Sequence, residues 1–301
     1  MIDINYLPTN SGTNELSRKK VSVLDTEMSY IDVGEGSPIV FLHGNPTSSY
    51  IWRNVIPYLT QYGRCLAPDL VGMGKSGKSP NNAYYFEDHV RHLDEWFKLL
   101  GLKKDITLVL HDWGSVLGFH WAYRNQMSVK AIVYMEAIVQ PRLWSDFPDG
   151  RDAIFRALKS EKGEQLIFDE NFFVETVLPK SIIRELTKEE MDVYREPFQS
   201  RESRLPTLIF PREIPIDGEP ANIVRIVEAY GHWLSGSPIP KLLVKAEPGA
   251  LLTGRALEYC RSWPNQREIS VSGIHYIQED SPKEIGTAIQ DFIARMNHLP
   301  Q

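Results

Sequence analysis

The stretch Ile106-Thr-Leu-Val-Leu-His-Asp-Trp-Gly-Ser115 constrains the fold of this chain more than any other segment. A run of β-forming apolar residues ends at Asp112, and a helical pattern begins directly afterwards. This is the arrangement of a nucleophile elbow, in which a sharp turn between a strand and a helix holds one reactive side chain clear of the sheet. The sequence therefore predicts an α/β sheet with Asp112 at the carboxyl end of a buried strand.

The rest of the chain alternates strand patterns with amphipathic helical patterns. We expect strands over residues 20–25, 28–32, 37–42, 64–67, 106–112, 131–135, 241–246 and 267–271. We expect helices over residues 50–58, 86–100, 115–125, 221–234, 254–263 and 282–297. The first two strands read as an antiparallel hairpin, joined near Thr26-Glu27, at a sheet edge. The alternation predicts an α/β fold with a doubly wound, mostly parallel, eight-stranded sheet, whose ligands bind at the carboxyl ends of the strands.

The pattern changes between residues 140 and 217. Short helical patterns over 151–159, 171–178 and 188–195 are separated by prolines, and no buried strand is evident. We interpret this segment as a helical cap lying over the sheet. The predicted organisation is a hydrolase-like core over 1–139, a cap over 140–217 and the second part of the core over 218–301.

Charge and composition exclude several classes of function. The formal net charge is −6, so no basic surface for nucleic acid or an anionic membrane is expected. No apolar run approaches the roughly 20 residues of a membrane-spanning helix. The first 20 residues have no apolar segment of the kind found in signal peptides, so we expect a cytoplasmic protein. Cys65 and Cys260 lie far apart in sequence, and we expect buried free thiols.

The segment from Gly72 to Ser79 matches the phosphate-binding pattern G-x-x-x-x-G-K-[ST] in its letters. A functional phosphate loop leads directly into a helix, whose N-terminus helps to bind the phosphates. Here Pro80-Asn-Asn-Ala follows, which is typical of further loop. We therefore interpret the segment as a glycine-rich loop without a nucleotide.

Asp112 has candidate partners further along the chain. An aspartate at this place could simply cap the next helix. However, hydrolases with this elbow carry an acid and then a histidine after the nucleophile. His275 follows the last predicted strand in a glycine-containing turn, whereas the other histidines after the elbow lie in helical patterns or in the tail. Glu136 and Glu247 both end predicted strands, so topology leaves the choice of acid open.

The type of nucleophile indicates the chemistry. A carboxyl with a reference pKa of about 3.9 is ionised at neutral pH. Asp112 could therefore attack a carbon that bears a good leaving group and form an ester with the protein. A histidine would then activate the water that hydrolyses the ester. The Trp113 indole and the Asn45 amide are neutral N–H donors that suit a departing halide. The alternatives are that Trp113 only packs in the core and that Asn45 only forms a turn.

At these residues the sequence resembles the haloalkane dehalogenases of the α/β-hydrolase superfamily. One departure from the generic elbow is Leu110, where a small residue is usual. The similarity spans nearly the whole chain, in residues 43–50, 69–76, 111–115, 136–138, 211–215, 246–251 and 275–282.

The resemblance implies a role for each of these residues. Asp112 would be the nucleophile and His275 the base, while Asn45 and Trp113 would bind the halide through their side chains and form the oxyanion hole through their backbone N–H groups. A subfamily with glutamate at the end of the sixth strand matches at Glu136, which favours Glu136 over Glu247. The expected pocket residues are Phe155, Phe172, Leu178, Pro211 and Leu251.

The expected reaction converts a small halogenated aliphatic substrate and water into an alcohol, a halide ion and a proton. It needs no cofactor and no metal, and we expect a monomer or a small homo-oligomer. An epoxide hydrolase would need tyrosine donors from the cap, where Tyr194 is the only tyrosine. A cofactor-independent luciferase of the Renilla kind would keep the same five residues. A ligand-binding protein without activity would have a broken triad.

Overall fold

The fold is built on one eight-stranded sheet. The computed structural model describes residues 16–147, 150 and 152–298. The strand order is β1-β2-β4-β3-β5-β6-β7-β8, and β2 runs antiparallel to both of its neighbours. The strands are β1 (Arg18–Val23), β2 (Thr26–Val33), β3 (Pro38–Leu42), β4 (Arg64–Pro68), β5 (Ile106–Asp112), β6 (Val129–Ala137), β7 (Lys241–Pro248) and β8 (Gln266–Gly273). The predicted doubly wound, mostly parallel sheet is confirmed.

Burial along the strands follows the apolar pattern of the sequence. All seven residues of β5 are buried, as is expected of a strand covered on both faces. The edge strand β1 has buried or half-buried residues between exposed ones. The hairpin is confirmed, but its turn lies at Leu24 and Asp25, two residues earlier than expected, because Val23 pairs with Thr26.

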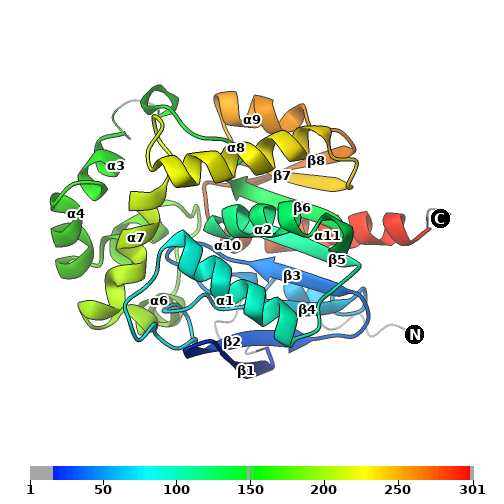
Figure 1. Cartoon of the computed structure of the whole chain (residues 1–301), viewed down its shortest axis with the longest axis horizontal. Coiled ribbons are helices and arrows are strands. Elements are labelled where there is room, and N and C mark those ends of the chain that lie inside the picture. The colour runs from blue at the N-terminus through cyan, green and yellow to red at the C-terminus, as the bar shows by residue number, and fades with distance from the viewer. Residues whose placement is uncertain (1–15, 148–149, 151, 299–301) are drawn as a thin grey trace.

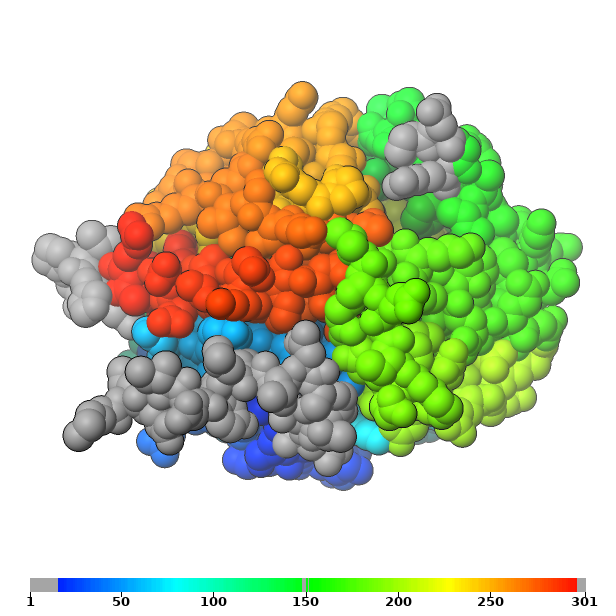
Figure 2. Space-filling model, turned by 180° about the vertical axis from the view of Figure 1, so that it is seen from behind, coloured from blue at the N-terminus to red at the C-terminus, as the bar shows by residue number. Residues whose placement is uncertain are grey.

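Helices cover both faces of the sheet. In Figure 1, α1 (Phe86–Leu99), α2 (Trp113–Arg124) and α8 (Ala221–Gly236) lie in front of the strands. The terminal helix α11 (Pro282–His298) lies on the opposite face, which is turned to the viewer in Figure 2. The helix α9 (Gly254–Arg261) connects β7 to β8. These helices confirm the expected alternation of helix and strand.

One expected helix is absent. Residues 50–58 form two short 3-10 helices, η1 (Ser49–Trp52) and η2 (Ile56–Tyr58), instead of one α-helix. Pro57 has no N–H group with which to bond to the carbonyl of Arg53, which disfavours a continuous α-helix through it. The observed bonds span three residues, as in Arg53 N–H to Tyr50 O at 3.1 Å.

The segment between β6 and α8 contains only helices and connecting loops in its described part. It gathers beyond the carboxyl ends of the strands (Figure 1), and Figure 2 shows it packed against the C-terminal part of the chain. We call residues 140–217 the cap. Its elements are η4 (Trp144–Asp146), α3 (Asp152–Leu158), α4 (Lys162–Glu164), the π-helical turns η5 (Gln165–Asp169) and η6 (Phe173–Val177), α5 (Leu178–Lys180), α6 (Lys188–Arg195), η7 (Glu196–Phe198), η8 (Glu202–Arg204) and α7 (Leu205–Glu213).

Three smaller expectations can be compared with the structure. Cys65 and Cys260 are free and buried, as predicted. The loop from Gly72 to Ser79 leads into no helix before Phe86, so it lacks the context of a phosphate loop. Among the described residues, no helix has both the length and the apolar character needed to cross a bilayer.

Candidate active site

Asp112 occupies a strained turn between β5 and α2. Its backbone has φ 49° and ψ −128°, a combination that a non-glycine residue adopts only where the surrounding fold enforces it. The loop after β3 approaches closely, because a Cβ atom at Gly44 would lie 2.0 Å from Asp112 Oδ1. The absence of a side chain at Gly44 therefore lets a backbone segment reach the Asp112 carboxylate.

The structure explains the unusual Leu110 of the elbow. A Cβ atom at Gly118, in the facing helix α2, would lie 2.2 Å from Leu110 Cδ2. The missing side chain of Gly118 thus makes room for the large side chain of Leu110. The strand and the helix can therefore pack closely although Leu110 has a large side chain.

Backbone N–H groups hold the Asp112 carboxylate. The N–H of Asn45 donates to Asp112 Oδ1 at 2.7 Å, and the N–H of Trp113 also bonds to this carboxylate. Burial favours the neutral carboxyl, but the hydrogen bond and charge of His275 outweigh it and lower the pKa of Asp112 below its ordinary value. Asp112 is therefore an ionised side chain in a nearly dry environment.

His275 lies between two carboxylates. Its Nε2 is 3.4 Å from Asp112 Oδ2, and its Nδ1 is 3.2 Å from Glu136 Oε2. Burial disfavours the imidazolium, but the hydrogen bonds and charges of Asp112 and Glu136 outweigh it and raise the pKa of His275 to about 9. At neutral pH the imidazole is consequently protonated between two anions.

The structure brings Glu136, and not Glu247, to the histidine. The Glu136 side chain is fully buried, and its Oε2 accepts the N–H groups of Ala250 at 3.0 Å and Leu251 at 2.8 Å. Glu247 is exposed and pairs with Lys245. Glu136 is the extra residue of a β-bulge, since Met135 pairs with His111 while Ala137 already pairs with Asp112. A bulge redirects the side chain it contains.

Two N–H donors beside Asp112 have no bond within the described part of the chain. Trp113 and Asn45 are buried residues, and within the described structure neither the Trp113 indole N–H nor the Asn45 amide NH₂ makes a hydrogen bond; the Asn45 Oδ1 acceptor is unbonded as well. Both side chains line a cavity that also contains Asp112 and His275. Because buried donors are normally bonded, these two are available to a ligand.

The cavity has a volume of about 220 Å³ and mostly apolar walls. Phe155, Pro211 and Leu251 line it, as the sequence suggested. Phe172 and Leu178 do not, and Phe173 and Val177 are found there instead. The resemblance implied Phe172 and Leu178, but the π-helical turn at Phe173–Val177 is wound more widely than an α-helix and presents different side chains to the cavity.

Comparisons with known proteins agree with this geometry. A family model described as alpha/beta hydrolase fold matches residues 37–282. A haloalkane dehalogenase of Sphingobium indicum is 51% identical over 93% of this chain and 96% of its own length. A haloalkane dehalogenase structure from Bradyrhizobium elkani has a TM-score of 0.90 at 42% identity, covering 94% of this chain and 99% of that one. The chain belongs to the haloalkane dehalogenase family.

A relative with another activity falls in the same range of similarity. The coelenterazine h 2-monooxygenase of Renilla reniformis is 43% identical over 92% of this chain and 91% of its own length. The choice between the two activities therefore depends on the properties of the cavity as well as on family membership.

Sequence reasoning assigned no role to several residues around this site. Tyr276 adjoins His275 and donates from its hydroxyl to the Asn45 carbonyl at 3.0 Å, which fixes the loop that carries Asn45. His111 Nε2 lies 2.9 Å from the His275 carbonyl oxygen, and burial lowers the pKa of His111 to about 3. A neutral His111 therefore donates an N–H to the loop that carries His275. The cap contributes Arg142, Phe147, Ile154, Leu158, Ser181 and Ile214, of which only Ile214 lies in a segment that resembles the dehalogenases.

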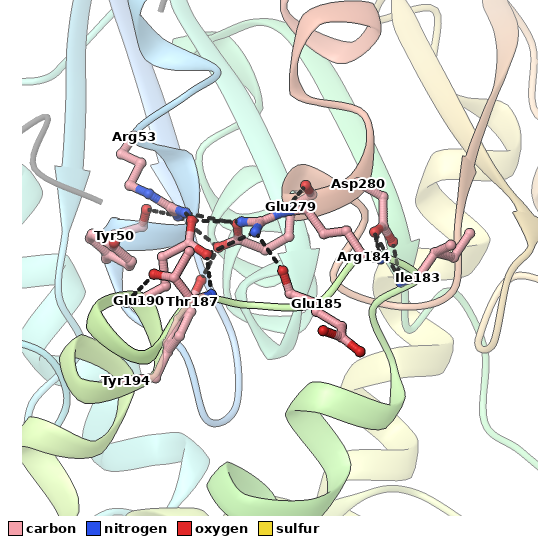
Figure 3. A network of polar contacts seen from close by, with 10 residues as sticks. All are labelled: Tyr50, Arg53, Ile183, Arg184, Glu185, Thr187, Glu190, Tyr194, Glu279 and Asp280. Carbon is pink, nitrogen blue, oxygen red and sulfur yellow. Dashed lines mark hydrogen bonds and ion pairs between the residues drawn. The ribbon is translucent and has the colours of Figure 1, made fainter. Parts of the chain in front are cut away.

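A buried cluster of charges joins the cap to this loop (Figure 3). Glu279, in the short helix α10 (Ile277–Asp280), contacts Arg53 of the core and Arg184 of the cap, and Glu190 contacts both arginines as well. We call these four residues the cap–core cluster. The cap also accepts the His275 N–H at Ser181 O, at 3.1 Å. The position of His275 thus depends on the docking of the cap. Among the described residues, no group of three or more His, Cys, Asp or Glu side chains could hold a metal ion.

Proposed function

We propose that this chain hydrolyses haloalkanes through an ester on Asp112. The observation that carries the proposal is the contact line Glu136–His275–Asp112, with two unbonded N–H donors beside the carboxylate in a mostly apolar cavity. The products are an alcohol, a halide ion and a proton. The proposal rests on the family membership and on these contacts together.

In the first step, Asp112 displaces the halide. An ionised Asp112 oxygen attacks the carbon that bears the halogen, so the C–O bond forms as the C–halogen bond breaks with its electron pair. Trp113 and Asn45 donate N–H groups to the departing halide, where negative charge develops. Both donors are neutral and lie in a nearly dry site, so their attraction for the ion is little screened.

Ester formation changes the state of His275. The ester carries no charge, so one of the two anions that keep His275 protonated disappears, and the pKa of His275 falls from about 9. The imidazolium then releases its proton to solvent and becomes a base. We propose that the first step activates the base required for the second.

In the second step, His275 takes a proton from water as the water oxygen attacks the ester carbonyl carbon. The backbone N–H groups of Asn45 and Trp113 stabilise the resulting oxyanion. The tetrahedral intermediate then collapses, and the bond between its central carbon and the alkoxy oxygen breaks. The alkoxy oxygen takes the proton of the hydroxyl group on that carbon and leaves as the alcohol. Asp112 is again ionised and His275 again protonated, so the balance is one halide, one proton and one alcohol for each water consumed.

The cap is proposed as the part that closes the site, with the core divided at 1–139 and 218–301. Its Phe155 and Pro211 cover the cavity, which excludes bulk water from the reacting atoms. Both steps use groups of the chain and water, so the proposed reaction calls for no cofactor. A cytoplasmic location and assembly as a monomer or small homo-oligomer remain predictions from the sequence.

Two alternative reactions receive less support. Tyr194, the candidate donor for an epoxide oxygen, is fully buried, donates its hydroxyl to Glu279 and does not line the cavity. The similarity to the coelenterazine h 2-monooxygenase of Renilla reniformis favours the second alternative. However, the cavity volume of about 220 Å³ lies below the usual range of about 300–1,000 Å³ for drug-sized ligands, which favours a small substrate.

Halide release tests the proposal. The wild-type protein is incubated with 1-bromobutane and 1,2-dibromoethane, and bromide is measured. We expect release by the wild type, and a His275→Phe variant that stops after the first step with a protein mass raised by one alkyl group. Absence of bromide from the wild type with both compounds would refute the proposal, and light emission with coelenterazine would then favour the monooxygenase.

A further inference from the structure

Arg142 is a buried cation without a counterion in the described part of the chain. It is 9% exposed, its Nε atom has no hydrogen-bond partner, and no carboxylate lies within ion-pair distance of its guanidinium. Its neighbour Asp146 pairs with Arg255 at 2.6 Å instead. Buried charges in proteins are normally paired, because an unpaired one loses its hydration without replacement.

The backbone around Arg142 fixes the direction of this side chain. The Arg142 N–H donates to Pro215 O at 2.9 Å, and the Arg142 carbonyl accepts the N–H of Asp217 at 2.9 Å. The residue is thereby held between the two ends of the cap. Its guanidinium carbon lies 4.6 Å from the ring centroid of Phe147, a contact that orients the planar group but leaves its N–H groups free to bind.

Arg142 lines the same cavity as Asp112, in a wall that is otherwise apolar. Among the described residues, no hydrogen bond or ion pair joins it to Asp112, Asn45 or Trp113. Asp146 and, more weakly, Glu136 act on Arg142 only through longer-range attraction. The cavity therefore holds halide donors around the nucleophile and, separately, a guanidinium, which pairs best with a carboxylate through two parallel hydrogen bonds.

We propose that Arg142 binds the carboxylate of substrates that carry a halogen at one end and an anionic oxygen group at the other, namely ω-halocarboxylates. This inference rests on the proposed function and names a substrate class for the same site. The halogen would lie at Trp113 and Asn45, with the carbon chain against the apolar wall. Asp112 displaces the halide as before, and water then releases an ω-hydroxycarboxylate and a proton.

The test compares two substrates that differ at the far end. Halide release from 6-bromohexanoate and from 1-bromohexane is measured for the wild type and for Arg142→Gln. A hydrogen-bonded charge pair corresponds to a change of about 10- to 100-fold, so kcat/KM for 6-bromohexanoate should fall by that factor in Arg142→Gln. The value for 1-bromohexane should change by less than about threefold, because no charge pair is lost.

Arg156→Gln is the matched control. It removes the same charge from the cap, from a side chain that is paired with Asp152 and does not line the cavity. Both substrates should keep their wild-type kinetics in this variant. If Arg142→Gln lowered kcat/KM equally for both substrates, Arg142 would serve only to balance the charge of Glu136, and the proposal would be wrong. Unchanged kcat/KM values for both substrates would overturn it as well.

Binding without turnover separates this inference from the proposed function. Calorimetry should detect binding of hexanoate to the wild type and at least tenfold weaker binding to Arg142→Gln, whatever the outcome of the halide assay. If 1-bromohexane is hydrolysed but 6-bromohexanoate is neither hydrolysed nor bound, the anion subsite is refuted while dehalogenation stands. If hexanoate binds through Arg142 but no bromide is released from either compound, dehalogenation fails and the subsite remains.

Discussion

The proposed catalytic line of Asp112, His275 and Glu136, called the catalytic line below, and the cap–core cluster are both largely buried arrays of charge, and α10 begins two residues after His275. In the cluster, each of the two carboxylates contacts each of the two guanidinium groups, so the four charges cancel (Figure 3). The Arg53 side chain is 2% exposed and that of Glu279 is 0% exposed. Each partner therefore depends on the others for the compensation that water would otherwise provide.

The catalytic line differs because polar groups beside it lack partners. The Trp113 indole and the Asn45 side chain have no hydrogen-bonded residue within the described structure, and Arg142 has no counterion there. The backbone at Asp112 is also strained. Leaving such groups unsatisfied costs stability, whereas satisfying them within the protein would leave nothing to bind a substrate. The cluster should therefore dominate stability, and the catalytic line should dominate activity.

Asp112→Ala should have the largest effect. Removal of the nucleophile abolishes the ester route, so the rate of halide release should fall by about 10⁴-fold or more. Unfolding in urea should remain cooperative, because the Asn45 loop and the cap keep their other contacts. Bromide release from 1-bromobutane measures the activity, and circular dichroism measures unfolding. If Asp112→Ala were both inactive and unfolded, the expected division, with activity depending on the catalytic line and stability on the cap–core cluster, would be wrong.

Glu279→Gln should reverse this pattern. The substitution keeps the shape of the side chain but leaves the guanidinium groups of Arg53 and Arg184 facing Glu190 alone. Breaking a buried ion pair in this manner costs about 3–5 kcal/mol, a large part of the roughly 5–15 kcal/mol of a typical domain. The urea midpoint should fall accordingly. Halide release by the protein that remains folded should decrease by much less than in Asp112→Ala, and a stability equal to wild type would contradict the role given to the cluster.

The pKa of His275 tests the proposed activation of the base. Loss of the Asp112 charge in Asp112→Ala should lower this pKa from about 9 by about 2 units, because a nearby opposite charge shifts a pKa by about 1–3 units. The titration of ¹⁵N-labelled histidine by NMR measures it. Glu247→Gln removes an exposed carboxylate without contact to His275 and should leave the value near 9.

The same shift predicts how stability depends on pH. Folding raises the pKa of His275 from 6.5 to about 9, so its contribution to stability is fully present below pH 6.5 and is lost as the pH rises through 9. In Asp112→Ala this dependence should weaken. An unchanged pKa for His275 in that variant would mean that ester formation does not create the base.

The sequence predicted those parts of the site that are encoded locally. The run from Ile106 to Ser115 contains the strand, the turn and the helix of the elbow, and His275 follows a strand directly. The choice between Glu136 and Glu247 depends instead on a bulge in β6, which a strand pattern does not reveal. The resemblance to known dehalogenases favoured Glu136, and only the geometry shows how its side chain reaches His275.

The cap was the least predictable region. Phe172 and Leu178 were expected to face the cavity, but the π-helical turn brings Phe173 and Val177 there. The cap–core cluster could not be foreseen either, because its members are separated by up to 226 residues and each is an ordinary surface residue type. Such contacts arise from tertiary packing, which periodicity within one element cannot show.

The smallest effect should come from an exposed ion pair that also joins core and cap. Lys75, in the loop after β4, pairs with Glu196 of the cap, and the two side chains are 44% and 50% exposed. Glu196→Gln is the same substitution as Glu279→Gln, but solvent compensates the charge that remains. The free energy of unfolding should change by less than about 1 kcal/mol. Urea unfolding of the two variants side by side then compares a buried carboxylate that has several partners with an exposed one that pairs with Lys75, and equal destabilisation would show that burial adds nothing to the cluster.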